Sequence, residues 1–329
     1  MYILFIIFLF SFFLGRLNTA NYFTDIFDQL SFQILIAGII LFFLLTFSKK
    51  IRTSIFCIII CFFLAIDILP ACKHCSALIK MNSENDSKIR LMTFNTSYAT
   101  DSNIGKWYLY LEELLIENKN PKMDDTKNLE ALRKLILTEN PDIVHFQEIN
   151  QNFKNKINTL RSILPYSHLI QYDEFPGIAD SIILSKHPFK EKNIEDNSII
   201  TKIIINETEL GILSVHLYSG FNKYRFNLAN KQIETLKNLI KDTNQNLIVI
   251  GDLNMTNVSK RFINFLEETN LYTYTSYIRP TFTWPAYLPS YFGIQIDHVL
   301  FSENIKMVKK KTVGHLGSDH RALIVDLVF

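Results

Sequence analysis

Carboxylates, amides and imidazoles recur at the ends of apolar stretches in the last three quarters of this sequence. They are Asn95, Glu148, His216, Asp252, Asn254, Asp297, Asp319 and His320. Hard oxygen ligands suit Mg²⁺, Mn²⁺ or Ca²⁺. Mg²⁺ usually keeps waters and binds one or two carboxylates together with substrate phosphate oxygens. The set therefore predicts a metal-assisted reaction on a phosphate ester, with Mg²⁺ as the expected ion and Mn²⁺ as an alternative.

The two histidines could complete such a site. An imidazole donates best to a phosphoryl oxygen or leaving group when a carboxylate orients its other nitrogen. Asp297 is the expected partner of His320. Asp252 and Asn254 are two residues apart, which places both side chains on one side of an extended backbone. One of them could accept a proton from water while the other holds that water or the phosphate.

Asp319 and His320 are sequence neighbours, and in a regular strand they would point to opposite faces. We therefore expect the chain to bend at Gly317 and Ser318, which would bring both side chains into one site. Taken alone, this acid-imidazole pair would be interpreted as a solvated loop. Its place at the end of a series of similar residues favours a functional interpretation.

Other polar residues are interpreted as structural or stay open. His145 and His298 are expected in the core, and His187 in a solvated turn. His315 could line the site or be structural. Arg321 could meet substrate phosphate or simply be exposed at the start of a strand. The aromatic, proline-rich segment 279–289 could face the substrate or be a packed loop.

Alternating elements must position these residues. Helical spacing predicts helices over 128–140 and 227–240, the first stopped by Asn140-Pro141. Apolar runs predict strands over 88–95, 142–149, 181–185, 199–207, 210–217, 246–254, 294–302 and 321–329. This order predicts a mixed α/β fold. Its polar residues fall at strand ends, where the sites of α/β proteins gather.

The first quarter of the chain is apolar. Runs Tyr2–Leu14, Phe32–Phe47 and Ile55–Leu69 are candidate spans, since a spanning helix needs about 20 mostly apolar residues. The first run is short. It lacks the basic start and the cleavage site of a signal peptide, so we expect a retained span. The sequence thus predicts a multi-pass region, attached to a lipid bilayer, of two or three helices.

Basic residues predict its orientation. Lys49, Lys50 and Arg52 form the tightest basic cluster, which places the loop after the second run in the cytoplasm. Everything after the third run is then outside, next to a bacterial inner membrane. The predicted domains are residues 1–70 in the membrane, a polar linker over 71–88, and a catalytic domain over 89–329.

Composition narrows the function classes. The 34 Lys and Arg nearly balance 32 Asp and Glu, for a net charge of +2, which argues against non-specific binding of polyanions. The cysteines all lie in the first quarter, at positions 57, 61, 72 and 75. Cys72 and Cys75 lack a second ligand pair nearby, so no zinc site is expected there.

Seven segments resemble motifs of one known family and occur in the same order as in that family. They are "TFN", "NPDIVHFQEI", "SIILSKHPF", "SVHL", "GDLNM", "QIDHVLF" and "GSDHRALIVDL". Together they resemble the endonuclease/exonuclease/phosphatase superfamily over nearly all of residues 89–329. This resemblance implies a DNase I-like four-layer α/β sandwich with two packed β-sheets. The preceding apolar region is similar to that of bacterial membrane-attached members.

The resemblance also implies a role for each site residue. Glu148 would be the main metal ligand, with Asn95 beside it and Asp319 assisting. Asp252 would activate the attacking water. The other roles it implies are orientation of the water or phosphate by Asn254, contact with the phosphate or leaving oxygen by His216, and stabilisation of phosphoryl charge by His320, oriented by Asp297.

One position departs from the family pattern. Many family nucleases have an acidic residue two positions after the first-strand asparagine, where this chain has Ser97. The difference favours a single metal. His216 matches the histidine of phosphatases, sphingomyelinases and DNase I, whereas some repair enzymes have tyrosine there.

The sequence therefore predicts a membrane-anchored, Mg²⁺-dependent hydrolase of phosphate esters. A lipid head group, a small molecule and a nucleic acid stay open as substrates. The alternatives are a nuclease acting on DNA or RNA, and a non-catalytic, membrane-tethered binding module that kept the fold.

Overall fold

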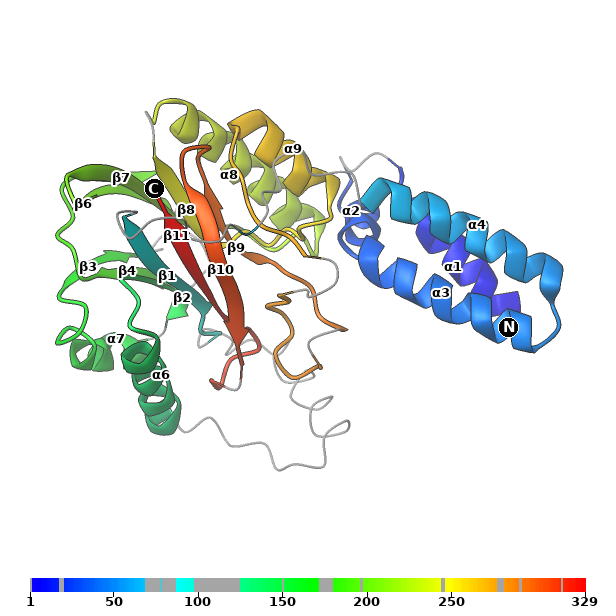
Figure 1. Ribbon diagram of the computed structural model, residues 1–329, viewed down its shortest axis with the longest axis horizontal. Helices are drawn as coiled ribbons and strands as arrows, with labels where there is room; N and C mark the ends of the chain where they lie inside the picture. Colours follow the sequence, from blue (N-terminus) through cyan, green and yellow to red (C-terminus); the bar gives the residue numbers. More distant parts are fainter. Residues whose placement is uncertain are drawn as a thin grey trace. The chain divides into compact units, whose positions relative to one another are not determined.

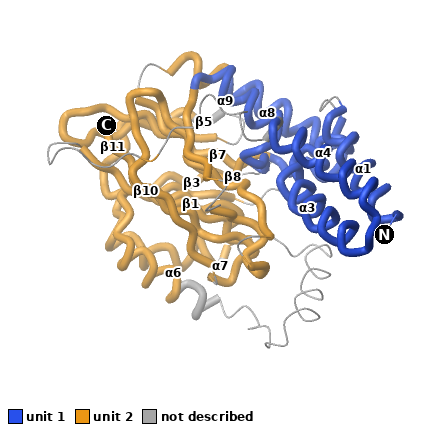
Figure 2. The backbone as a smooth tube through the Cα atoms, turned by 45° about the vertical axis from the view of Figure 1, so that its right-hand side comes forward, with its two compact units in different colours: residues 1–75, 218–237, 254–270 blue, residues 76–217, 238–253, 271–329 orange. Residues whose placement is uncertain are grey.

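The structure, a computed structural model, describes residues 2–17, 21–68, 78, 87–97, 125–149, 151–171, 180–195, 198–243, 246–276, 281–289, 292–314 and 316–329. The chain divides into two compact units (Figure 2). Unit 1 comprises residues 1–75, 218–237 and 254–270, and unit 2 comprises residues 76–217, 238–253 and 271–329. The domain ranges 1–70, 71–88 and 89–329 stay a prediction.

Unit 2 contains two β-sheets (Figure 1). The six-stranded sheet has the order β10-β11-β1-β2-β4-β3, and β1 pairs parallel with β2. Its strands are β1 (Lys88–Asn95), β2 (Ile143–Ile149), β3 (Tyr166–Ile170), β4 (Asp180–Ser185), β10 (Lys306–Val313) and β11 (Ala322–Val328). Strands β3 and β10, at its two edges, were not predicted from the sequence.

The five-stranded sheet has the order β5-β6-β7-β8-β9, with β7 and β8 parallel. Its strands are β5 (Lys192–Glu195), β6 (Ser198–Ile205), β7 (Thr208–His216), β8 (Leu247–Asp252) and β9 (Asp297–Phe301). The strands predicted over 199–207 and 210–217 are confirmed as β6 and β7, which pair antiparallel as a hairpin. All six residues of β8 are buried, which explains its continuous apolar run.

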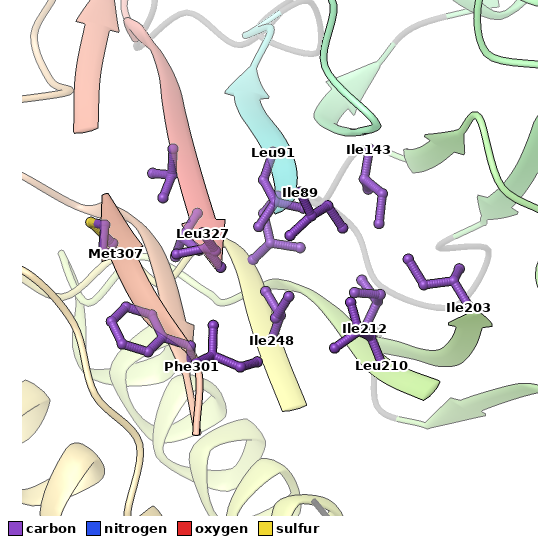
Figure 3. Close-up of a cluster of buried hydrophobic side chains, with 14 of the residues drawn as sticks. Ile89, Leu91, Ile143, Ile203, Leu210, Ile212, Ile248, Phe301, Met307 and Leu327 are labelled. Atoms are coloured by element: carbon purple, nitrogen blue, oxygen red, sulfur yellow. The ribbon is translucent and has the colours of Figure 1, made fainter. Parts of the chain in front are cut away.

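The two sheets face each other across an apolar core (Figure 3). Ile89, Leu91 and Leu327 of the six-stranded sheet point toward Leu210, Ile248 and Phe301 of the five-stranded sheet. The core is rich in β-branched side chains, which pack well on pleated surfaces. The predicted mixed α/β fold with two packed sheets is confirmed.

The opposite face of the six-stranded sheet carries a second apolar cluster, to which helices contribute. Leu132 and Ile136 of α6 (Asp125–Glu139) and Phe153 of α7 (Gln151–Lys156) share it with Phe94 and Phe146. A short 3₁₀ helix spans Ile157–Thr159. Helix α6 ends just before Asn140, whose φ of +49° breaks the helix, and Pro141. Three of the four predicted layers therefore lie in this unit: the two sheets and the layer of α6 and α7. The fourth layer stays a prediction.

Gly251 is the one position in β8 that has no room for a side chain. Its φ is +148°, and a Cβ there would lie 1.8 Å from the carbonyl oxygen of Val215 in β7. Replacement by alanine must therefore push β8 away from β7.

Gly251→Ala is expected to lower the free energy of unfolding by about 3 kcal/mol or more. Urea denaturation of the detergent-solubilised chain measures the effect. Gly220→Ala is the control, since its Cβ would meet no atom closer than 3.5 Å. Equal stability of the two variants would contradict the steric argument.

Unit 1 contains α1 (Tyr2–Leu14), α2 (Tyr22–Gln29), α3 (Ser31–Phe47) and α4 (Ile51–Ile68), with α9 (Lys260–Thr269) and most of α8 (Lys223–Lys241). Helices α1, α3 and α4 lie side by side (Figure 1). A Cβ on Gly38 of α3 would lie 2.6 Å from Sγ of Cys61 and from the ring of Phe8. The three helices therefore pack closely at this glycine.

The apolar runs are helical as expected, but their span lengths are not confirmed. Among the described residues, no single helix is long and apolar enough to cross a membrane. Helices α2 and α3, bent by 60° at their junction, meet that criterion together by length and composition. Cys57 and Cys61 are buried thiols, whereas Cys72 and Cys75 lie outside the described residues.

Candidate active site

Sheet register aligns three of the predicted site residues. His216 at the end of β7 pairs with Asp252 at the end of β8, and Asp252 pairs with Asp297 at the start of β9. The three residues thus form one row across the five-stranded sheet. All are buried, with exposed fractions of 5%, 1% and 0%. The sequence placed each at a strand end but could not predict that the three ends align.

The six-stranded sheet supplies the next two residues from parallel neighbours. Asn95 ends β1 and pairs with Gln147 of β2, one residue before Glu148. The pairing of β2 with β4 shifts register between Phe146 and Ile149, and Glu148 has a φ of +54°. This bulge breaks the strand alternation and changes the direction of the Glu148 side chain.

Asn95 connects the two sheets. Its Nδ2 donates to Oε1 of Glu148 at 3.0 Å and to Oδ2 of Asp252 at 3.1 Å. Nε2 of His216 lies 3.5 Å from the same Glu148 oxygen. One buried amide therefore holds two carboxylates from different sheets side by side, with an imidazole next to them.

His320 contacts both Asp297 and Asp252. Its Nδ1 lies 2.9 Å from Oδ2 of Asp297, and its Nε2 lies 3.9 Å from Oδ2 of Asp252. The predicted contact with Asp297 is present. Burial disfavours a charged imidazole, but the carboxylates of Asp297, Asp319 and Asp252 outweigh it and raise the pKa of His320 to about 10. His320 is therefore an imidazolium at neutral pH.

Asp319 belongs to a network beside this row. Trp284 donates its indole N–H to Oδ2 of Asp319 at 2.9 Å, and the Ser97 hydroxyl donates to Oδ1. Ser97 also donates its backbone N–H to Oδ1 of Asn95 at 3.0 Å. Ser97 and Trp284 were not predicted as site residues. The signal for Trp284 was its place in an aromatic segment shortly before Asp297.

The expected bend before Asp319 is present. Gly317 has a φ of +79°, residues 316–320 form no strand, and β11 begins only at Ala322. Ser318 stabilises the bend, because its hydroxyl donates to the Asn95 carbonyl at 2.7 Å and accepts from the His320 backbone N–H at 3.0 Å. The two neighbouring side chains can therefore serve different partners.

Asn254 lies two residues after Asp252 and begins a segment of unit 1. Its φ is +47°, so the extended backbone assumed from the sequence ends before it. Its place beside the other site residues stays a prediction.

The remaining candidates have structural positions. His145 and His298 are buried as expected, and burial together with nearby His216 lowers the pKa of His145 to about 3. His187 is half-buried rather than solvated, and His315 lies outside the described residues. Arg321 differs from both of its sequence-based interpretations. It is buried, and its guanidinium donates to the carbonyls of Phe282, Ala286 and Leu288.

These contacts favour the packed loop among the two interpretations of segment 279–289. Its described part, residues 281–289, is bound by Arg321 and by the hydrogen bond from Trp284 to Asp319. The loop is therefore packed against the start of β11.

The site is rich in negative charge. Four carboxylates, those of Glu148, Asp252, Asp297 and Asp319, surround one imidazolium, so a bound cation would relieve their repulsion. Ligand atoms of Asp252, Asp297 and His320 lie within 4.8 Å of one another and could hold a metal ion. That set differs from the predicted ligands Asn95, Glu148 and Asp319, of which Asn95 and Glu148 are in contact. The donor set thus fits a metal-dependent enzyme.

The sequence profile of the Endonuclease/Exonuclease/phosphatase family matches residues 92–320, which include every candidate site residue. The chain belongs to this family. Its members hydrolyse phosphoester bonds, so the buried carboxylates and imidazoles lie in a fold used for that reaction. A comparison with curated proteins found no match.

Solved structures share the family fold. The endonuclease/exonuclease/phosphatase family protein from Leptotrichia buccalis C-1013-b has a TM-score of 0.55 at 13% identity, covering 73% of this chain and 100% of that one. D. rerio TDP2 complexed with a single strand DNA product has a TM-score of 0.52 at 15% identity, covering 74% and 99%. SmcL has a TM-score of 0.52 at 14% identity, covering 74% and 99%. Identities this low establish the fold alone.

Proposed function

We propose that this chain is a membrane-anchored, Mg²⁺-dependent phosphoesterase in which Asp252 activates the water that attacks phosphorus. The observation that carries the proposal is the position of Asp252 between the Asn95 amide and the Asp297–His320 pair. Its carboxylate is buried and oriented from both sides. Such a group can take a proton from water without having to reorganise its surroundings.

Each neighbouring side chain has a role in this reaction. Asp252 accepts a proton from the attacking water. The water oxygen bonds to phosphorus as the ester oxygen leaves in line. The His320 imidazolium, held by Asp297, stabilises the charge growing on the phosphoryl oxygens. His216 assists the leaving oxygen, and Asn254 orients the water or the phosphate. No covalent bond to the enzyme is formed.

Glu148 would hold Mg²⁺, with the Asn95 amide oxygen and Asp319 assisting. The ion would neutralise charge on the substrate phosphate. We assign it to this side because Glu148 and Asp319 offer carboxylate oxygens, which Mg²⁺ prefers as ligands, and Glu148 is in contact with Asn95.

Exposed apolar side chains support attachment to a bilayer. Helices α1, α3 and α4 expose large hydrophobic residues, including Ile3, Phe10, Phe13, Phe43, Phe47, Phe62 and Phe63. Large apolar side chains exposed in such number are typical of a protein or membrane contact. The basic residues Lys49, Lys50 and Arg52, at the junction of α3 and α4, support an orientation with that loop in the cytoplasm and the catalytic residues outside. A reporter fused after Phe329 is expected to be active only outside the cytoplasm.

Chelation tests the reaction class. The purified full chain in detergent is expected to hydrolyse at least one of bis(p-nitrophenyl) phosphate, sphingomyelin, lysophospholipid, inositol phosphate, DNA and RNA. EDTA should abolish this activity, and added Mg²⁺ should restore it.

Mn²⁺ in place of Mg²⁺ tests ion identity, and the substrate that is cleaved identifies the ester class. Absence of hydrolysis across this panel would favour the non-catalytic binding module. Hydrolysis of DNA or RNA alone would instead favour a nuclease.

A further inference from the structure

Helix α2 turns its polar side inward. Thr24, Asp25 and Asp28 are buried, with exposed fractions of 8%, 2% and 3%, whereas Phe23 is 47% exposed and Leu30, just after the helix, is 36% exposed. Buried carboxylates are costly unless they are paired or hydrogen-bonded. Asp25 and Asp28 therefore need ion-pair or hydrogen-bond partners within the unit.

Its partners lie in one short segment of the same unit, which begins two residues after Asp252. Oε1 of Gln29 accepts from the Thr256 backbone N–H at 2.5 Å, and the Thr256 hydroxyl donates to the Gln29 carbonyl at 2.9 Å. Thr256 is 2% exposed, so this reciprocal pair satisfies groups that have lost water.

Two carboxylates bind the far end of that segment. Oδ2 of Asp28 accepts from the Lys260 backbone N–H at 2.7 Å, in the first turn of α9. A carboxylate there is favoured by unpaired N–H groups and the helix dipole. Oδ2 of Asp25 accepts from the Arg261 guanidinium at 2.9 Å, in an ion pair whose side chains are 3% and 10% exposed. Dissolved salt screens buried pairs of this kind much less than exposed pairs.

Local hydrogen bonds join the two ends. The Thr256 carbonyl accepts from the Ser259 backbone N–H at 3.0 Å and from its hydroxyl at 2.9 Å, and Ser259 caps α9. Residues 256–261 therefore form one hydrogen-bonded turn, which contacts α2 at both ends. Asn254 precedes this turn by a single residue, Met255, which is fully buried.

We propose that α2 is a positioning helix for the active site, with Gln29 and Asp28 fixing the turn that follows Asn254. The N-terminal helices then do more than attach the chain to a bilayer, because they set the geometry of a catalytic residue. This inference rests on the proposed function of Asn254. It predicts that loss of the α2 contacts lowers kcat while the substrate still binds.

Thr256 offers a matched pair of substitutions for the test. Thr256→Val removes the hydroxyl at nearly constant volume, and Thr256→Ser retains it. Gln29→Ala removes the acceptor on the other side of the contact. Asn264→Ala, at an exposed position of α9, is the control. All variants are full-length chains in detergent with Mg²⁺, and bis(p-nitrophenyl) phosphate is the probe.

We expect Thr256→Val and Gln29→Ala to lower kcat about tenfold with KM changed by less than about twofold, since small misplacements of a positioned group are costly in rate. Thr256→Ser should retain at least about half of the wild-type kcat, and Asn264→Ala should match it. Hydrogen exchange of the backbone amides of residues 254–261 should accelerate about tenfold in the two impaired variants only.

Two results would overturn the inference. One is faster exchange at 254–261 with an unchanged kcat, which would make the contact purely structural. The other is unchanged exchange in both Gln29→Ala and Thr256→Val, which would mean that α2 does not hold the turn. If the wild-type chain is inactive on the whole substrate panel, the proposed function fails. The exchange data still decide whether α2 holds the turn, so the two failures are distinguishable.

Discussion

Asp252→Asn is expected to lower kcat by about 10³-fold while KM stays within about twofold of the wild-type value. Asparagine keeps the size of the side chain and can still accept from Asn95. Its amide cannot take a proton from water at neutral pH. Initial rates with bis(p-nitrophenyl) phosphate and Mg²⁺ measure the effect, and circular dichroism verifies the fold.

The matched control is Asp242→Asn, which removes an exposed carboxylate in the same unit. It should retain wild-type activity. If Asp252→Asn keeps more than about a tenth of the wild-type kcat, Asp252 is not the general base, since removing a base normally costs at least about 10² in rate.

Asp297→Asn is expected to lower the free energy of unfolding by about 3 kcal/mol, because it leaves the buried His320 imidazolium without its counter-charge. Asp297 is fully buried, and its carboxylate lies 2.9 Å from Nδ1 of His320. Activity should fall as well, since an unoriented imidazole cannot hold charge at the phosphoryl group. Urea denaturation of wild type and variant at pH 7 measures the loss.

The same pair gives stability a pH dependence of known sign. The pKa of His320 is raised from 6.5 to about 10 on folding. Its stabilisation is therefore fully present below pH 6.5 and is lost as the pH rises through about 10. The stability difference between wild type and the double variant Asp297→Asn/His320→Gln should shrink over this range. A difference that grows with pH would contradict the charged pair.

The sequence predicted the central strands better than the edge strands. Strands such as β8 are buried on both faces and read as continuous apolar runs. Strand β10 contains four lysines at the edge of its sheet, where charge is common and conceals the strand pattern. Helix α9 was predictable in principle, since Ser259 caps it and Phe262, Phe265 and Leu266 have helical spacing.

The site residues were predicted as a set, but of their contacts only the pair Asp297 and His320 was predicted. A polar residue at the end of an apolar strand is visible in the sequence, whereas the partner strand and its register depend on long-range packing. The bridge from Asn95 to Asp252 and the bond from Trp284 to Asp319 cross between elements far apart in the chain. The inward polar face of α2 was also invisible, because its partners lie in segment 256–261.

The alignment of His216, Asp252 and Asp297 limits where the chain can accept insertions and deletions. A residue added within β8 would slip its pairing and turn every later side chain of that strand to the other face. Asp252 would then leave the row that it shares with its neighbours on both sides. Residues added between β7 and β8, or between β8 and β9, leave the row intact. We therefore expect length variation among relatives to fall in those connections, and the strand lengths leading to the row to stay constant.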